Sequence, residues 1–230
     1  MSTLIRRATA KDLPRLMALH YRMFTTNTNY LLLLGRGFLN RLLLWYCTAN
    51  EAFTLVAEGP SGVAGYIAVY LGSYYVALRA NWSHALLGLV AHPTLVFHPL
   101  FKHRLKALLG AWAEPVGAPT QCACLAYLAV DPAMGSRGSA PALIQAALSE
   151  CRSRGWWEVV TAMHPDNLRV RYLYAMLGFE SYSGPDSEGL VSVRIDLHPK
   201  ATPVTQEPHL QEAGRPAQKA TDSSVNPGHL

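Results

Sequence analysis

The stretch from Val130 to Ala140 has the sequence VDPAMGSRGSA, and it follows an apolar run, Leu125–Val130, with the composition of a buried strand. Within this loop, two glycines stand on either side of Arg137. Directly after it, Pro141 opens a pattern of small and apolar residues that predicts a helix. Proline is tolerated in a first helical turn, because the N–H group that it lacks would have no partner there. The predicted order is therefore strand, small-residue loop, helix.

That order predicts an anion site at the start of the helix. The first N–H groups of a helix have no acceptor within it, and the helix dipole adds partial positive charge. Glycine and serine let a phosphate approach the backbone, and Arg137 adds a fixed positive charge. The loop is neither a dinucleotide fingerprint nor a P-loop, because it lacks G-x-G-x-x-G and a closing Gly-Lys-Ser/Thr. By itself it is weak evidence, since many glycine-rich turns bind no ligand.

A second motif follows at residues 167–179, with the sequence NLRVRYLYAMLGF. Together the two motifs resemble those of the GNAT acyl-CoA N-acyltransferase superfamily. The first is similar to its pyrophosphate loop, V-x-P-x-x-[Q/R]-x-x-G-x-[G/A]. The second is similar to its helix N-x-x-A-x-x-L-Y-x-x-x-G-F, with Val170 where alanine is usual. The pair spans residues 125–180, and its order and spacing make it specific.

The resemblance implies an α/β (α+β) fold, with a mixed, mostly antiparallel central sheet and flanking helices. The periodicity of apolar residues along the chain fits the usual GNAT order of strand, two helices, antiparallel strand pair and motif strand. In the second motif Val170, Leu173, Tyr174 and Leu177 share one helix face, and Gly178 is expected to end that helix. The other elements that we expect are a strand at 3–6, a helix capped by Thr9 that runs to about residue 24, a helix at 31–47 broken near Gly35, a hairpin of strands at 53–58 and 63–70, and strands at 157–163, 179–183 and 190–197.

For the domain organisation we predict one GNAT domain at 1–198 with a helical insertion at 71–118, and a disordered tail at 199–230. The tail is polar, proline-rich and without apolar periodicity, so it lacks the residues for a core. The insertion stands where a minimal GNAT domain has a short link. With this insertion the chain resembles a bacterial GNAT subgroup that has a helical insertion before the motif strand. Leu34-Gly35 and Phe38-Leu39, in the second helical stretch, are part of the same resemblance.

The insertion is basic, apolar and aromatic, and its segments 79–91 and 100–112 favour helices. Its charged residues are Arg79, Lys102, Arg104 and Lys106 against Glu114. Two interpretations stay open. One is a helical cap over the acceptor site, and the other is a face at 79–112 that meets a membrane surface.

The composition and net charge of the chain limit the classes of partner that we expect it to bind. Half of the 230 residues are hydrophobic, which is enough for a full core, and the net charge is +5. A mild positive balance fits an anionic cofactor, and it also fits an acidic membrane surface or nucleic acid. No Lys/Arg-rich run with interleaved aromatic residues is present, so we predict no nucleic-acid partner.

The cysteines bear on disulfides and metal sites, and the first residues of the chain bear on its cellular location. Four cysteines do not make a disulfide framework in a chain of this length, and Cys122 and Cys124 have no second Cys/His pair at metal spacing. We therefore predict no metal site. The chain starts with charged residues and has no apolar segment of the signal-peptide kind. We predict a cytoplasmic protein, with a membrane-peripheral one as the alternative.

Acyl transfer from a thioester to an amine requires a held donor, a hydrogen-bond donor for the oxyanion, and a path for protons. The resemblance implies that acetyl-CoA is the co-substrate and that its pantetheine arm pairs with the backbone of Leu128, Ala129 and Val130. It also implies that Asn167 binds near this arm and that Tyr174, which also contacts the cofactor, protonates the leaving thiolate. The residues implied to hold the pyrophosphate are Gly135, Ser136, Arg137, Gly138, Ser139 and Ala140.

Each of these residues also has a structural interpretation. Tyr174 fits a core position on an apolar helix face, Asn167 fits a helix N-cap, and Arg137 fits a solvated loop charge. One departure from the family pattern is Gly135, which stands where glutamine or arginine is usual, so one phosphate contact is missing. The other is Cys124, which stands where some members carry a carboxylate.

The general base stays open. The candidates are His20, Glu58, His164 and a water chain to bulk solvent, and histidine titrates in the right range. The predicted function is transfer of an acetyl or short acyl group from acetyl-CoA to a primary amine, by direct attack in a ternary complex. The acceptor is a small molecule, an amino sugar or a protein. The alternative is a non-catalytic CoA-binding or interaction protein on the same fold.

Overall fold

The computed structural model describes residues 3–25, 29–60, 62–72, 75–97, 121–134, 138–186 and 189–198. The chain divides into two units, Met1–His198 and Pro199–Leu230. The expected disordered tail and the helix expected at 100–112 lie outside the described residues. They stay predictions.

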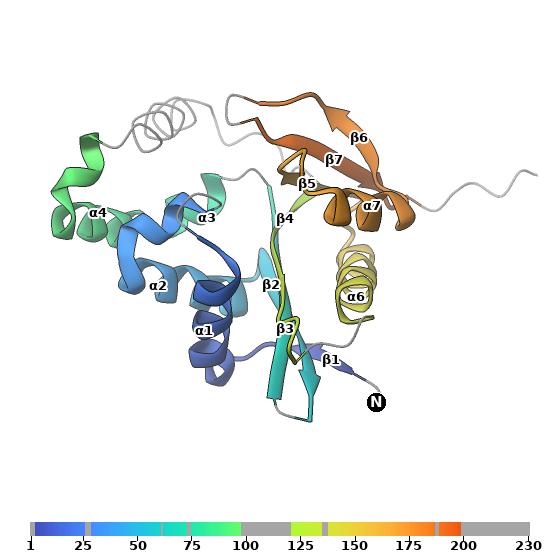
Figure 1. Cartoon of the computed structure of the whole chain (residues 1–230), viewed down its shortest axis with the longest axis horizontal. Helices are drawn as coiled ribbons and strands as arrows, with labels where there is room; N and C mark the ends of the chain where they lie inside the picture. Colours follow the sequence, from blue (N-terminus) through green and yellow to red (C-terminus); the bar gives the residue numbers. More distant parts are fainter. Residues whose placement is uncertain are drawn as a thin grey trace, which may run out of the picture. The chain divides into compact units, whose positions relative to one another are not determined.

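Seven strands of the described chain form one sheet in the order β1-β2-β3-β4-β5-β7-β6 (Figure 1). All neighbouring strands are antiparallel except β4 and β5, which are parallel. This is the mixed, mostly antiparallel sheet that the sequence predicted. The strands are β1 (Leu4–Arg7), β2 (Ala52–Gly59), β3 (Gly62–Leu71), β4 (Cys122–Val130), β5 (Glu158–Met163), β6 (Glu180–Ser183) and β7 (Val191–Asp196).

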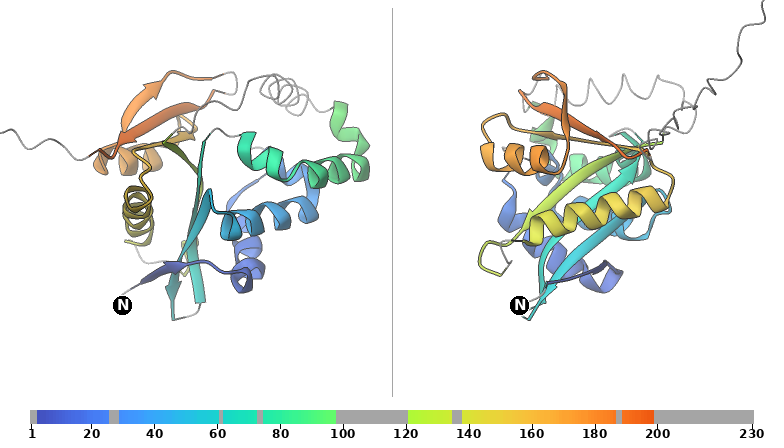
Figure 2. Two further views of the ribbon diagram at one scale, coloured as in Figure 1. Left: turned by 180° about the vertical axis from the view of Figure 1, so that it is seen from behind. Right: turned by 90° about the vertical axis from the view of Figure 1, so that its right-hand side faces the viewer.

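Helices cover both faces of this sheet, as Figures 1 and 2 show. On one face lie α1 (Leu13–Met23) and α2 (Gly35–Thr48), and on the other lie α6 (Ser139–Ser153) and α7 (Leu168–Met176). The insertion contributes α3 (Tyr75–Ala80) and α4 (Trp82–Ala91), which pack on α2. Short 3-10 helices occupy Ala10–Asp12, Tyr30–Leu34 and Pro93–Phe97.

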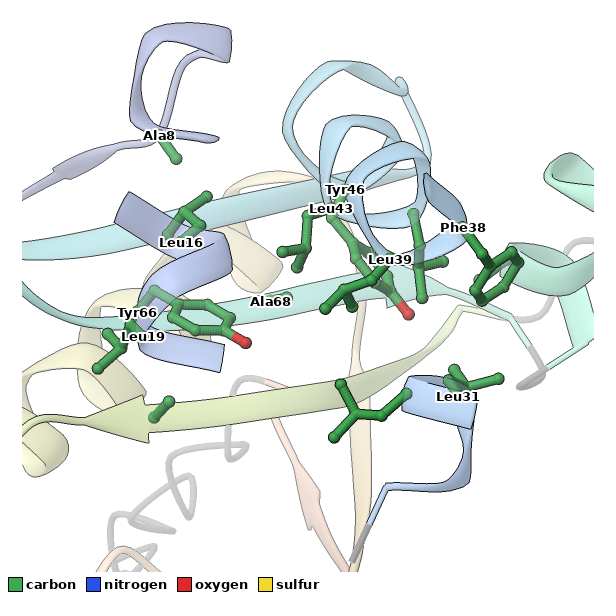
Figure 3. Packing of buried hydrophobic residues seen from close by; sticks show 14 of the residues in the cluster. Ala8, Leu16, Leu19, Leu31, Phe38, Leu39, Leu43, Tyr46, Tyr66 and Ala68 are labelled. Atoms are coloured by element: carbon green, nitrogen blue, oxygen red, sulfur yellow. The ribbon is translucent and has the colours of Figure 1, made fainter. Parts of the chain in front are cut away.

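The two faces of β3 are both buried, and its side chains alternate between two cores. Tyr66 and Ala68 lie in the core under α1 and α2, where Leu16 and Leu39 are fully buried (Figure 3). Ile67 lies in the core under α6 and α7, with the α6 residues Leu143, Ile144 and Ala147. Because successive strand residues point to opposite faces, a strand buried on both sides is apolar throughout. This is the pattern of β3.

Local signals predicted several boundaries correctly. Gly35 has φ of +86° and separates the 3-10 turn Tyr30–Leu34 from α2, which is the predicted break. Gly178, with φ of +87°, follows α7 as predicted. Positive φ favours glycine because other residues have a Cβ that clashes there.

The insertion differs from the prediction. The helix expected at 79–91 is two helices, α3 and α4, which meet at Asn81. The Asn81 side chain is buried and donates from Nδ2 to the carbonyl of Ala77 at 2.8 Å. An asparagine that bonds to its own backbone competes with the helix, so the helix stops at Asn81. Among the residues described, no helix combines the length and the apolar character needed to cross a membrane.

Candidate functional site

The parallel strands β4 and β5 pair only at their beginnings. The described pairs are Cys122 with Glu158, Ala123 with Val159, and Cys124 with Val160. Beyond Cys124, β4 continues for six more residues, Leu125–Val130, and stays paired with β3 on its other side. In Figure 1 the β5–β7–β6 part of the sheet turns away from the β1–β4 part. The far half of β4 therefore has one edge that no described strand covers.

A β-bulge lies where this opening begins. Leu125 faces Val69 and Tyr127 faces Ala68, so Ala126 is an extra residue in β4. Ala126 and Tyr127 consequently both pack on the α1–α2 side. A bulge bends its strand and increases its twist, which turns the end of β4 away from β5.

At the point of divergence, β4, β5 and α7 meet through hydroxyl groups. Thr161 of β5 is buried and donates its hydroxyl to the carbonyl oxygen of Leu125 at 3.1 Å. The hydroxyl of Tyr174, from α7, is hydrogen-bonded to the same Thr161 side chain.

Tyr174 is buried, and its ring packs on Phe179 with the ring centres 4.9 Å apart. Burial raises the pKa of Tyr174 to about 12, and the hydrogen bond with Thr161 opposes the shift. The phenol is therefore protonated at neutral pH. Through Thr161 it lies at the point where β4 and β5 stop pairing.

The N-terminus of α6 follows the loop that leaves β4. The helix begins at Ser139, and Gly138 precedes it with φ of −94° and no side-chain cap. A Cβ built on Gly138 meets no atom within 4 Å. At this helix start Gly138 and Ala140 flank Ser139, which is fully buried. The start of a helix presents backbone N–H groups and positive dipole to an anion. The predicted loop residues Gly135, Ser136 and Arg137 lie outside the described residues.

Asp131 anchors the start of this loop. Its N–H donates to the carbonyl of Ala64 at 2.8 Å, and its Oδ1 accepts from the N–H of Ala133 at 2.9 Å. Its other carboxylate oxygen forms an ion pair with Arg22 of α1. Gly65 adds a close approach, because a Cβ there would lie 3.0 Å from the carbonyl oxygen of Ala129. The start of this loop, at Asp131, and the open end of β4 are therefore held in place from two sides.

The predicted residues Leu128, Ala129 and Val130 lie on the uncovered half of β4. Asn167 is the N-cap of α7, and its side chain accepts from the N–H of Val170 at 3.3 Å. This confirms its structural interpretation, and its role near a pantetheine arm stays a prediction.

Some residues of the site were missed by sequence reasoning. The Asp-Pro pair at Asp131 is a turn signal that could have identified the anchor, because aspartate side chains accept bonds from the backbone two residues on. Thr161 is a lone hydroxyl among apolar strand residues, which is a weaker signal. No local pattern marks the bulge at Ala126.

His20, one of the proposed bases, is fully buried between α1 and the sheet. The Asn29 side-chain amide donates to Nε2 at 2.7 Å, so the neutral ring carries its hydrogen on Nδ1, which lies 2.5 Å from the Tyr66 hydroxyl. Burial lowers the pKa of His20 to about 4. Both ring nitrogens are engaged in the core, so His20 is structural.

The other two candidate bases, Glu58 and His164, and the thiol of Cys124 lie in three different environments. Glu58 accepts from the guanidinium of Arg6 at 2.6 Å. Burial raises the pKa of the Cys124 thiol to about 11, so it stays protonated near neutral pH and does not replace a carboxylate base. His164 is exposed at the end of β5, with Nδ1 3.4 Å from Asp166.

Within the described ranges, no group of three or more His, Cys, Asp or Glu side chains is placed to hold a metal ion. All four cysteines are described, and all are free.

The model of the Acetyltransferase (GNAT) family matches residues 35–179. No protein with a curated description matches the sequence.

Solved structures share the fold. A ribosomal-protein-alanine N-acetyltransferase from Brucella melitensis is 18% identical with a TM-score of 0.56, over 84% of this chain and 99% of that one. A phosphinothricin acetyltransferase from Sinorhizobium meliloti, solved with AcCoA, is 14% identical with a TM-score of 0.56, over 86% and 89%. The ribosomal-protein-S18-alanine N-acetyltransferase from Escherichia coli is 12% identical with a TM-score of 0.52, over 85% and 94%. At these identities the likeness concerns the fold.

Proposed function

The chain belongs to the GNAT acetyltransferase family, and from that premise we propose that it transfers an acetyl or other short acyl group from acetyl-CoA to a primary amine. The observation that carries this proposal is the uncovered edge of β4 beyond Cys124, with the Tyr174 hydroxyl at its apex. An exposed strand edge takes an extended ligand as it would take another strand.

In this proposal the backbone of Leu128, Ala129 and Val130 pairs with the pantetheine arm. The first turn of α6 holds the pyrophosphate through Gly138, Ser139 and Ala140, and the loop residues 135–137 complete that cradle. Asn167 closes the opening from the start of α7. The edge of β4 and the start of α6 fit acetyl-CoA, because β4 offers an extended polar edge and α6 offers N–H groups and positive dipole.

The chemistry needs both substrates bound together. The amine nitrogen attacks the thioester carbonyl, a C–N bond forms, and the C–S bond breaks. Tyr174 gives its proton to the departing sulfur and regains one from solvent, and the proton that the amine loses goes to solvent. Burial raises the pKa of a thiol as it raises that of a phenol, so a thiolate bound beside Tyr174 would take up a proton more readily than a thiolate in water.

The test is to incubate the protein with acetyl-CoA and a panel of amines, and to follow free CoA and the mass of the acetylated product. The panel contains small amines, amino sugars, a peptide with a free N-terminus and a lysine peptide. We expect CoA release that depends on protein and on at least one amine, together with a raised melting temperature in acetyl-CoA. Absence of binding by any acyl-CoA would contradict the proposal.

A non-catalytic CoA-binding protein is the second candidate, favoured by Cys124 at the position of a carboxylate. Its buried thiol supplies no base near neutral pH. Binding of acetyl-CoA with no CoA release across the whole panel would support this candidate.

A further inference from the structure

The helix α4 is apolar on nearly all sides, with the sequence WSHALLGLVA. One side packs on the protein core, where Ala85 and Leu89 lie against the α1–α2 cluster. Gly88 is packed so closely that a Cβ would lie 2.5 Å from the carbonyl oxygen of Leu34. The helix is therefore firmly attached to the body of the protein. Figure 1 shows α4 on the side of α2 that faces away from the sheet.

The other side of α4 carries large apolar side chains into solvent. Trp82, Leu86 and Val90 recur every four residues and are 55%, 50% and 71% exposed, and Leu87 beside them is 64% exposed. We call these four residues the α4 surface. Four large apolar residues on two turns of one helix make a continuous patch, and a helix that is apolar all round is normally covered on both sides.

The charged residues in the sequence that surrounds α4 have one sign. The sequence from Leu71 to Ala113 contains no aspartate or glutamate, so all 15 acidic residues of the chain lie elsewhere. The same stretch contains Arg79 within α3 and three further cations, Lys102, Arg104 and Lys106, directly after the described part of the insertion. An apolar surface on a cationic, acid-free segment complements an anionic lipid surface, where tryptophan and leucine enter the interface and cations meet the headgroups.

We propose that the α4 surface docks this protein onto an anionic lipid membrane, with α4 lying in the plane of the interface. A second copy of the chain is the less favoured occupant. A two-fold interface built on α4 would bring two acid-free cationic segments together, and like charges repel. This inference goes beyond acetyl transfer and does not depend on it.

The experiment is co-sedimentation of the full chain with vesicles, without any acyl-CoA. Vesicles of phosphatidylcholine with a quarter phosphatidylglycerol are compared with pure phosphatidylcholine, for the wild type and for Leu87→Glu/Val90→Glu. The control is Leu4→Glu/Met176→Glu, which makes the same charge change at exposed apolar positions outside the insertion. All four side chains are exposed, so the variants are expected to melt like the wild type.

The proposal expects the wild type and the control to bind the anionic vesicles alike, within about twofold. It expects the α4 variant to bind about tenfold more weakly or less, and added salt to weaken wild-type binding. Equal binding of both double variants would overturn it, as would equal binding to neutral vesicles. The absence of vesicle binding would also overturn it. If the wild type then self-associated in sedimentation velocity, and the α4 variant alone lost this association, the α4 surface would be assigned to a second copy of the chain.

Discussion

His20 and Tyr174 are buried titratable side chains on opposite faces of the sheet, and the hydrogen-bonded clusters that hold them differ in their surroundings. On the α1–α2 face, His20 is enclosed by Tyr66 and Asn29, and both ring nitrogens have partners within the core. On the other face, the Tyr174 hydroxyl is hydrogen-bonded to the Thr161 side chain at the point where β4 and β5 stop pairing. Both groups have strongly shifted pKa values.

The comparison shows that a shifted pKa does not by itself identify a catalytic group. Burial causes the main shift in both residues. What separates them is position, because protein partners close the His20 cluster, whereas the Tyr174 cluster lies beside the edge of β4 that no described strand covers. We therefore propose that His20 serves stability and that Tyr174 serves the reaction, and the following changes test this division.

The largest effect is expected for Tyr174→Phe. Loss of the proton donor is expected to lower kcat about 10²- to 10³-fold, while the dissociation constant of acetyl-CoA changes less than about threefold. Steady-state kinetics and titration calorimetry measure the two quantities. Tyr172→Phe is the matched control, because Tyr172 is exposed on the same helix. If Tyr174→Phe kept the wild-type kcat, the hydroxyl would be as structural as His20.

The next largest effect is expected in the stability of the protein at acid pH, and it depends on His20. Its folded-state pKa of about 4 lies below the ordinary value of about 6.5, so the unfolded chain binds more protons between these two pH values. The free energy of unfolding should therefore fall by about 3 kcal/mol as the pH drops from 7 to 4. Urea unfolding at several pH values measures this slope.

The variant His20→Asn sharpens this test. It should be about 2 kcal/mol less stable than the wild type at pH 7, because the buried partners of His20 lose their hydrogen bonds. Its free energy of unfolding should change less than that of the wild type as the pH falls toward 4. His164→Asn, at an exposed histidine, should keep the wild-type slope. Parallel slopes for the wild type and His20→Asn would remove His20 as the cause.

A smaller effect is expected where the open end of β4 is held. In Gly65→Ala the new Cβ would lie 3.0 Å from Ala129 O and Val130 Cγ2 and 3.3 Å from Leu143 Cδ1. The backbone oxygen cannot move without shifting β4, so we expect a loss of about 2 kcal/mol in stability and weaker acetyl-CoA binding.

Gly37→Ala is the control for that change, because Gly37 lies in α2 with open space around it. It should leave binding unchanged and raise the stability by up to about 1 kcal/mol. Equal acetyl-CoA affinities for Gly65→Ala and the wild type would mean that the end of β4 does not hold the ligand.

The smallest effect is expected for Thr161→Val, which removes the hydroxyl shared by Leu125 and Tyr174. We expect a loss of about 1 kcal/mol in stability and a decrease of several-fold in kcat. Combined with Tyr174→Phe, the two changes should be non-additive in kcat, because they act through one hydrogen bond. Full additivity would separate Thr161 from the reaction.

The sequence predicted the parts of the fold that depend on neighbours in the chain. Asn167 caps α7, Gly178 ends it and Gly35 breaks the second helical stretch, because each depends on a local backbone preference. The family resemblance led to Leu128, Ala129 and Val130, and the structure places them on the uncovered half of β4.

The remaining features depend on residues far apart in the sequence. The bulge at Ala126 follows from the register of β4 against β3, and a register between distant strands leaves no local pattern. The ion pair of Arg22 with Asp131 likewise joins α1 to a loop more than a hundred residues later. The break at Asn81 depends on a buried side chain whose burial the sequence did not predict.

The most direct test of the central claim is isothermal titration of acetyl-CoA into the wild type, Gly138→Glu and Gly37→Glu. A Cβ has open space at both glycines, so each variant adds the same charge without a clash. The account predicts binding in roughly the micromolar range for the wild type and Gly37→Glu. It predicts a loss of about tenfold or more for Gly138→Glu, whose carboxylate would face the phosphates at the start of α6. Equal affinities for the two variants, or no binding by the wild type, would contradict it.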